Sequence, residues 1–496
     1  MSAGDGREGK VRAGLAKARL GGNLAGKSLP RQIMTIAAWP LLEQVLSFIC
    51  TSTSLFLATH LNTPPEETTA ITAGIGVTGY VLWLGFLIQS GVGMGATALV
   101  SRMTGARKFG EANYYTNQAF SLGLLSGLVA AVLMWCTTGP LVRHVLGLQA
   151  AAAGVADEYM NIASWVAVFS GIIFAVNAAL RGSGDTRTPF YVMLVMDGLN
   201  IVFSLIFTQV FGLGVPGLAW GLICGTVSAV LLLMMVLGRR SAQMHRLLNG
   251  QLLDAYAASR GEDYRPPLYL EAPALRPCRA AIRRILSIGL PQSIEIGGIW
   301  VIQIIVLAVI ADMGDAYVGA QNIAIRIESI SFLPGFAIGM AGAALVGQYL
   351  GAGSVRMALQ TIHRCTLYAV IFMGCMGLVF YFFAGFFVDI FASNAAAVHE
   401  VAEPVVRLFV VMEPVYAGML LLKMCLRGAG DTRRVMWVSY GGMGFFRVVC
   451  LLVWAHLWPN TLTLHGIWLL FAVDMAAEFW VLRRLVRGMG WARRRV

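Results

Sequence analysis

The sequence repeats two unrelated segments at one fixed interval. Residues 180–187 read LRGSGDTR, and 246 residues later residues 426–433 read LRGAGDTR. The segment GMGATALV at 93–100 has a counterpart, GMAGAALV at 339–346, at the same spacing of 246 residues. Two segments that recur at one offset indicate a chain built from two related halves. In hydrophobic proteins, such halves commonly flank a path that opens alternately to the two sides of a membrane.

The composition indicates that most of the chain lies in lipid. Hydrophobic residues make up 57% of the 496 residues and charged residues only 12%, whereas soluble proteins average about 25% charged residues. A span of the hydrocarbon core needs roughly 20 apolar residues. Twelve segments of this kind are found, near 33–59, 72–100, 116–138, 159–180, 189–211, 215–238, 286–311, 317–347, 366–388, 404–425, 435–457 and 464–482.

The basic residues are distributed unevenly between the two sides. If the twelve spans alternate, 32 of the 37 Lys and Arg residues fall in segments on one side, and the opposite loops hold only Arg143. This asymmetry places both termini in the cytoplasm. The net charge of +12 therefore reflects membrane orientation. The expected partner of these cations is an anionic cytoplasmic leaflet, not nucleic acid.

The spans and the repeats define the domain organisation. We expect a disordered basic cytoplasmic tail at 1–31, a six-helix lobe at 32–238, a cytoplasmic linker at 239–284, a second six-helix lobe at 285–485 and a basic tail at 486–496. Six spans is an even number, so both lobes enter the membrane in the same sense. The prediction is an all-α inner-membrane protein with two parallel six-helix bundles, acting as a monomer.

The repeated loop has the composition of a helix–helix connector. Its shared residues are Arg181, Gly182, Gly184 and Asp185 in the first copy and Arg427, Gly428, Gly430 and Asp431 in the second. The arginines suit the negative end of a helix dipole, and the glycines permit the helix to stop. We expect Asp185 to neutralise Arg181 and Arg187, and the Thr188 hydroxyl to cap the next helix, with Asp431 or Thr432 capping the second copy. We interpret the loop as a charged connector between two helices that fixes the topology, and the alternative interpretation is a ligand site.

The chain resembles the multidrug and toxic compound extrusion (MATE) transporters. The resemblance rests on the loop in both halves and on four further segments, PLLEQ at 40–44, GLP at 289–291, NIAIRIE at 322–328 and LVGQ at 345–348. It covers about residues 32–485 and implies antiport, in which H⁺ or Na⁺ enters while an amphipathic, often cationic, compound leaves. In many bacterial relatives an aspartate stands where this chain has Ser54. Asn200 matches a family asparagine, and Ser204 stands where those relatives carry a second acid.

Charged residues inside the predicted spans need partners or a wet cavity, because a charge at the bilayer centre costs about 2.5–3.5 kcal/mol. Arg447 and Asp474 lie near the middle of neighbouring spans and are expected to form a structural ion pair, which Glu478 could share. Arg326 and Glu328 are two residues apart and should each find a partner on another helix. Lys423 and Arg407 can extend to the interfaces.

Four acids remain without an obvious basic partner. They are Asp197, Glu295, Glu413 and Glu43, and we expect them to couple cation movement to transport, with Asn200, Ser54 and Ser204 as neighbouring oxygen ligands. The alternative for each acid is a protonated carboxyl group hydrogen-bonded to the next helix, without a role in coupling.

The sequence gives less information about the substrate cavity and about alternative functions than about the membrane spans. Candidate cavity residues, chosen for cation–π and soft apolar contacts, are Tyr80, Trp83, Trp165, Met193, Trp300 and Tyr416, although helix packing and interfacial belts explain such residues equally. The eight cysteines and seven histidines show no metal-ligand or catalytic spacing, so we expect no metal, no cofactor and no enzyme activity. The alternative transport function is a flippase for a lipid-linked precursor. Such a protein would need several cavity arginines, and only Arg326 and Arg447 are candidates.

Overall fold

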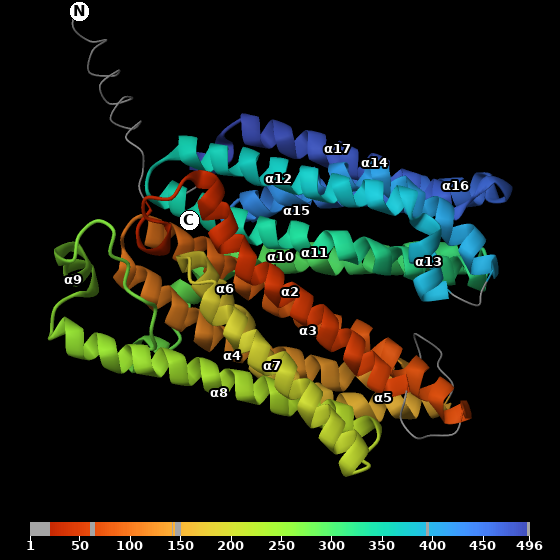
Figure 1. Ribbon diagram of the computed structural model, residues 1–496, viewed down its shortest axis with the longest axis horizontal. Coiled ribbons are helices and arrows are strands. Elements are labelled where there is room, and N and C mark those ends of the chain that lie inside the picture. Colours follow the sequence, from red (N-terminus) through yellow and green to blue (C-terminus); the bar gives the residue numbers. More distant parts are fainter. Residues whose placement is uncertain (1–19, 60–64, 141, 144–149, 393–395, 494–496) are drawn as a thin grey trace, which may run out of the picture. The chain divides into compact units, whose positions relative to one another are not determined.

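The computed structural model describes residues 20–59, 65–140, 142–143, 150–392 and 396–493, and these residues are almost entirely helical (Figure 1). Twelve described segments are long and apolar enough to cross a membrane, as predicted. The candidate spans lie on α2 (Leu29–Thr59), α3 (Pro65–Gly105), α4 (Phe109–Pro140), α6 (Val166–Ser183), α7 (Arg187–Leu205), α8 (Val215–Leu248), α10 (Arg279–Ala311), α11 (Asp315–Gly351), α12 (Val355–Phe382), α14 (Ala396–Gly428), α15 (Thr432–Met443), whose span continues through α16 (Leu451–Leu457), and α17 (Leu464–Arg487). The remaining α-helices are α5 (Ala150–Ala163), α9 (Leu253–Ser259) and α13 (Ala384–Ala392). The cytoplasmic placement of the termini stays a prediction.

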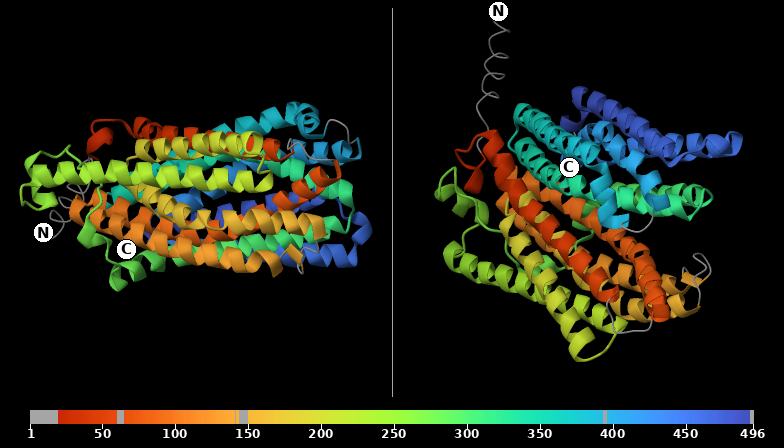
Figure 2. Two further views of the ribbon diagram at one scale, coloured as in Figure 1. Left: turned by 90° about the horizontal axis from the view of Figure 1, so that it is seen from below. Right: turned by 45° about the vertical axis from the view of Figure 1, so that its right-hand side comes forward.

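The first compact unit, here the N-terminal unit, consists of residues 20–25 and 42–293. Within it α7 packs along α8, and α4 lies against α3 and α6 (Figures 1 and 2). Small residues allow the helix backbones to approach closely, as in many membrane bundles. A Cβ atom on Gly123 of α4 would lie only 2.5 Å from the carbonyl oxygen of Gly171 on α6.

The second compact unit, here the C-terminal unit, consists of the described residues in 26–41 and 294–493. Helix α14 is its centre and contacts α11, α12 and α17. The first turns of α2 belong to this unit, and within it the hydroxyl of Tyr349 on α11 donates to the buried side chain of Gln32. The units therefore divide differently from the predicted lobes at two places. Residues 32–41 join the C-terminal unit, and residues 285–293 of α10 join the N-terminal unit.

The segment predicted as a linker is folded against the N-terminal unit. Helix α8 continues to Leu248, ten residues beyond the predicted span, and the chain then runs along α4. Buried amide side chains of α4 bind its backbone. Asn117 donates to the carbonyl of Tyr269 (Nδ2–O 3.1 Å), Asn113 accepts from the N–H of Tyr269 (2.9 Å), and Gln118 donates to the carbonyl of Ala274 (2.7 Å). Side-chain amides thus replace the missing backbone partners of a non-helical segment.

Candidate functional site

The two repeated segments of each half pack against each other. In the N-terminal unit, a Cβ atom on Gly182 would lie 3.0 Å from the carbonyl oxygen of Thr97. In the C-terminal unit, a Cβ atom on Gly428 would lie 2.3 Å from the carbonyl oxygen of Ala343. Each member of the first contact lies 246 residues before its counterpart, so the duplication preserves a helix–helix contact and not only two isolated motifs.

The repeated loops end their helices as the glycines predict. Gly184 has a φ of 93° and Gly430 a φ of 87°, which is the left-handed region that favours glycine after a helix. The N–H of Gly184 donates to the carbonyl of Arg181 (2.9 Å), and that of Gly430 donates to Arg427 (2.8 Å).

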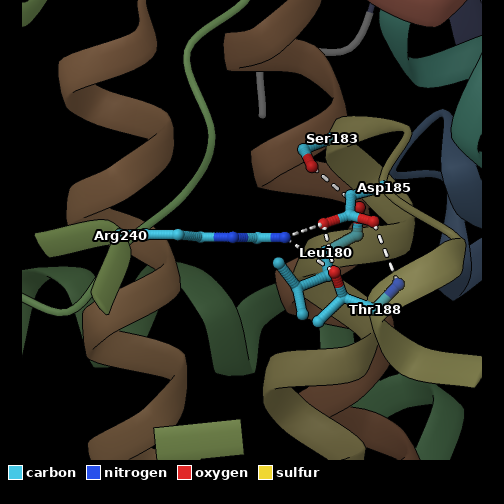
Figure 3. Close-up of polar contacts among 5 residues, drawn as sticks. All are labelled: Leu180, Ser183, Asp185, Thr188 and Arg240. Carbon is cyan, nitrogen blue, oxygen red and sulfur yellow. Dashed lines mark hydrogen bonds and ion pairs between the residues drawn. The ribbon is translucent and has the colours of Figure 1, made fainter. Parts of the chain in front are cut away.

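Asp185, not Thr188, caps the helix that follows the first loop. Its carboxylate accepts from the backbone N–H of Thr188 (Oδ1–N 3.1 Å) and from the Thr188 hydroxyl (Oδ2–Oγ1 2.7 Å). Figure 3 shows the guanidinium of Arg240, on α8, pointing at the same two residues. Arg240 Nη2 lies 2.9 Å from Asp185 Oδ2. The expected Thr188 cap was therefore wrong, because Thr188 lies in the first turn of α7, after the N-cap residue Thr186, and Asp185 binds its N–H. In the second copy Asp431 occupies the expected N-cap position of α15, but its side chain makes no capping hydrogen bond there and pairs with Arg434 Nη1 at 3.4 Å.

Glu43 and Glu295 have basic partners, contrary to the sequence-based expectation. The guanidinium of Arg181 donates to Glu43 within the N-terminal unit. Within the C-terminal unit, Arg427 Nη2 lies 2.7 Å from Glu295 Oε1, which also accepts from the Ser439 hydroxyl at 2.5 Å. The repeated-loop arginine of each half therefore binds the glutamate that follows the proline of that half's first helix. Their equivalent positions in the two halves were the signal that could have revealed this pairing.

Asp197 lies in a buried cluster formed by α2 and α7. Its carboxylate accepts from the Ser47 hydroxyl (Oδ2–Oγ 2.9 Å), and the Cys50 thiol lies 3.6 Å from its backbone carbonyl oxygen. Asn200 Nδ2 lies 3.4 Å from Cys50 Sγ, and the Ser204 hydroxyl donates to Asn200 Oδ1 at 3.2 Å.

The structure thus joins Asp197, Asn200 and Ser204 as predicted neighbours, and Ser54 reaches the cluster through the Cys50 thiol. Ser47 and Cys50 were missed. They follow Glu43 by four and seven residues, so they share its face of α2.

The C-terminal unit contains two further buried ion pairs. The predicted pair is present, with Arg447 Nε 2.7 Å from Asp474 Oδ2, and the Arg447 guanidinium also lies 4.5 Å above the Phe471 ring. Glu478 forms its ion pair with Lys423 and interacts with Arg447 electrostatically. Lys423 is only 4% exposed, so the expectation that it extends to the interface was wrong. Arg407 is exposed and pairs with Glu403 (2.5 Å).

Glu413 is the acid of this unit with a neutral partner. It is 1% exposed, and its Oε2 accepts from the Ser331 hydroxyl at 2.8 Å. Glu328 interacts electrostatically with both Glu413 and Arg447. Arg326 is exposed, and within the described part of the chain no ion pair of Arg326 is found, so its expected helix partner is not seen.

The predicted cavity residues are not gathered by the described contacts. Trp83 and Trp165 are each 45% exposed. Tyr416 stacks on Phe332, with ring centroids 6.0 Å apart. Met193 and Trp300 are half-buried, and the side chain of Tyr80 lies outside the described residues. Among the described residues, no group of His, Cys, Asp and Glu has the arrangement of a metal site.

Comparison with known proteins identifies the family. The sequence profile of the MatE family matches residues 40–206 and 291–453, one match in each half. "Probable multidrug resistance protein NorM" of Thermotoga maritima is 24% identical over 371 residues, which cover 74% of each chain. The protein of the same name from Rhizobium meliloti is 25% identical over 428 residues, or 84% of this chain and 86% of the relative.

Solved structures share the fold. A mutant of the Vibrio cholerae MATE transporter VcmN has a TM-score of 0.78 at 18% identity, over 94% of this chain and 99% of that chain. A MOP superfamily transporter from Pyrococcus furiosus, described as having a binding pocket of reverse polarity that suggests a different function, has a TM-score of 0.77 at 19% identity, over 93% and 96% of the two chains. Since the family profile matches well over half of the sequence, the chain belongs to the MatE family of multi-pass membrane efflux transporters.

Proposed function

We propose that this protein is a secondary antiporter that exports amphipathic, often cationic, compounds in exchange for H⁺ or Na⁺. The coupling ion is its only inorganic requirement, and the protein acts as a monomer in a bilayer with an anionic cytoplasmic leaflet. Family membership supports efflux. The coupling proposal rests on the surroundings of one side chain, Asp197.

Asp197 is a buried carboxyl group with neutral hydrogen-bond partners. It is 4% exposed and receives the Ser47 hydroxyl, with Cys50 and Asn200 next to it. No described cation pairs with it, whereas Glu43 and Glu295 are paired with arginines. An ionised carboxylate without a counter-ion at this depth is expensive, so proton or cation binding lowers the free energy of the buried group. Asp197 is therefore the first coupling candidate.

Glu413 is the corresponding candidate in the C-terminal unit. Its described polar partner is the Ser331 hydroxyl, and the nearby Glu328 adds a second negative charge. Arg447 and Lys423 are already bound to Asp474 and Glu478. Among the described residues of this unit, the buried acids thus outnumber the buried bases, which supports binding of a proton or cation at Glu413 and the neighbouring Glu328.

The flippase alternative is disfavoured by the same contacts. A pyrophosphate group would need free guanidinium groups inside the protein. Arg447 is bound to Asp474, and Arg326 is on an exposed face.

The test is transport in proteoliposomes that contain the full chain. Export of a fluorescent lipophilic cation should follow an imposed proton or sodium gradient. Asp197→Asn should abolish the response to the gradient, because a neutral amide neither binds nor releases a proton. Asp157→Asn on α5, whose carboxylate pairs with the exposed Arg143, is the matched control and should transport normally. Transport that ignores both gradients, or normal coupling in Asp197→Asn, would contradict the proposal.

A further inference from the structure

We propose that Arg181 and Glu43 form a positioning clamp that sets the register of α2 against Asp197. This inference rests on the proposed function only in the role it gives Asp197. The clamp itself is a geometric statement about the N-terminal unit, and it removes Glu43 from the coupling candidates.

The first argument is the alignment of residues along α2. Ser47 lies four residues after Glu43 and Cys50 lies seven, so the three side chains stand on one face of the helix. Glu43 is held by Arg181, whereas Ser47 donates to the Asp197 carboxylate at 2.9 Å. A change in the depth or rotation of α2 at Glu43 is therefore transmitted over one turn to the hydroxyl that touches Asp197.

The second argument is that Arg181 stands on a rigid support. It lies in the last turn of α6, which Gly184 ends with a left-handed φ of 93°. The neighbouring Gly182 has almost no space against α3, since a Cβ atom there would lie 3.0 Å from the Thr97 carbonyl oxygen. The Thr97 hydroxyl also donates to the carbonyl of Ala178, at 3.0 Å. The guanidinium is thus fixed relative to α3 and α6, and α2 is the element that it positions.

The third argument is the duplicate of the clamp. Arg427 and Glu295 repeat the same pair in the C-terminal unit, where Glu295 also receives the Ser439 hydroxyl. The residues four and seven positions after Glu295 are Ile299 and Ile302, which carry no polar group. The Arg427–Glu295 pair therefore holds its helix without a hydrogen bond that leads to a proposed coupling acid. Because it has the same chemistry and similar burial, it serves as a control for the Arg181–Glu43 pair.

Cys50 offers a direct measurement of the clamp. Its thiol is 4% exposed and lies between Asp197 and Asn200. The other seven cysteines are replaced, and the rate at which N-ethylmaleimide labels Cys50 is measured in the folded, purified full-length protein. Glu43→Gln should raise this rate by about tenfold or more, because an ionised hydrogen bond that holds the helix is lost. Glu295→Gln should leave the Cys50 rate within about twofold of the parent, since local opening is confined to the cooperative unit that is weakened.

The charge-retaining variant Glu43→Asp covers the case in which Glu43→Gln does not fold. Its shorter side chain should raise labelling by about threefold, a smaller effect than loss of the charge. An unchanged rate in the folded Glu43 variant, or an equal rise in Glu295→Gln, would overturn the clamp.

Transport separates the clamp from the proposed function. If Asp197 couples transport, the pH of half-maximal transport should move by at least about 0.5 unit in Glu43→Gln and stay unchanged in Glu295→Gln, because only the first alters a hydrogen bond at Asp197. If Glu43→Gln alone raises Cys50 labelling but Asp197→Asn still couples normally, the proposed function is contradicted and the clamp stands. If Asp197→Asn loses coupling but Cys50 labelling does not respond selectively to Glu43→Gln, the clamp is contradicted and the proposed function stands.

Discussion

Replacement of the repeated glycines by alanine should affect the two halves unequally. Gly182 and Gly428 occupy equivalent positions at the ends of α6 and α14, and alanine in a helix gains up to about 1 kcal/mol over glycine. Against this gain stands the space available to a Cβ atom. At Gly182 the nearest atom is 3.0 Å away, so the backbone of Thr97 must shift by a few tenths of an ångström. The two effects nearly cancel, and we expect Gly182→Ala to be close to neutral.

At Gly428 the same substitution is expected to destabilise the protein. The Cβ atom would meet three backbone atoms of Ala343, at 2.3, 2.5 and 2.7 Å. Backbone cannot rotate away as a side chain can, so α11 and α14 must separate by roughly 1 Å to reach normal van der Waals distances. Overpacking of this kind costs about 1–3 kcal/mol, which exceeds the gain in helix propensity.

The measurement is the apparent Tm of the purified full-length protein in detergent. Gly428→Ala should lower it by roughly 2–6 °C, and Gly182→Ala should change it by less than about 2 °C. Gly441→Ala in α15 is the control, because no atom lies within 4 Å of its Cβ position. A loss of Tm in Gly182→Ala as large as that in Gly428→Ala would refute the reasoning from contact distances.

Two further predictions concern ion pairs. Arg447→Ala leaves the buried Asp474 carboxylate without its counter-ion and should lower the free energy of unfolding by about 3–5 kcal/mol, measured as a fall in Tm. The double variant Arg447→Ala/Asp474→Ala should lose less stability than Arg447→Ala alone. An equal or larger loss in the double variant would argue against a direct ion pair. Arg240→Ala removes the guanidinium that binds Asp185 and Thr188 and should lower the free energy of unfolding by about 1–3 kcal/mol. Arg239→Ala, at an exposed position, should change the stability little. Equal losses of stability in the two variants would show that this contact does not hold the loop.

The sequence predicted contacts of the candidate site where both residues lie on one helix or on two helices joined by a short connection. Asp197 and Asn200 are three residues apart and so share one face of α7, and the structure links them through Cys50. Ser204, which the family resemblance pointed to, donates to Asn200. Arg447 and Asp474 lie on helices joined by a short connection, so their depths in the membrane could be matched from the sequence. Helical periodicity fixes the face of a residue, and hydropathy fixes its depth.

The sequence by itself determined the duplication, the twelve spans and the glycine-ended loops, because each of these follows from local conformation or from the length of an apolar run. Only the tertiary structure decided which charges on non-adjacent helices meet. Glu43 binds Arg181, 138 residues away, and Glu478 binds Lys423, a partner that the sequence did not predict. Periodicity specifies the side of a helix but not the helix that packs there, so partners on non-adjacent helices are fixed only when the bundle assembles. That assembly leaves Asp197 and Glu413 with neutral hydrogen-bond partners, which is why we propose these two acids for coupling.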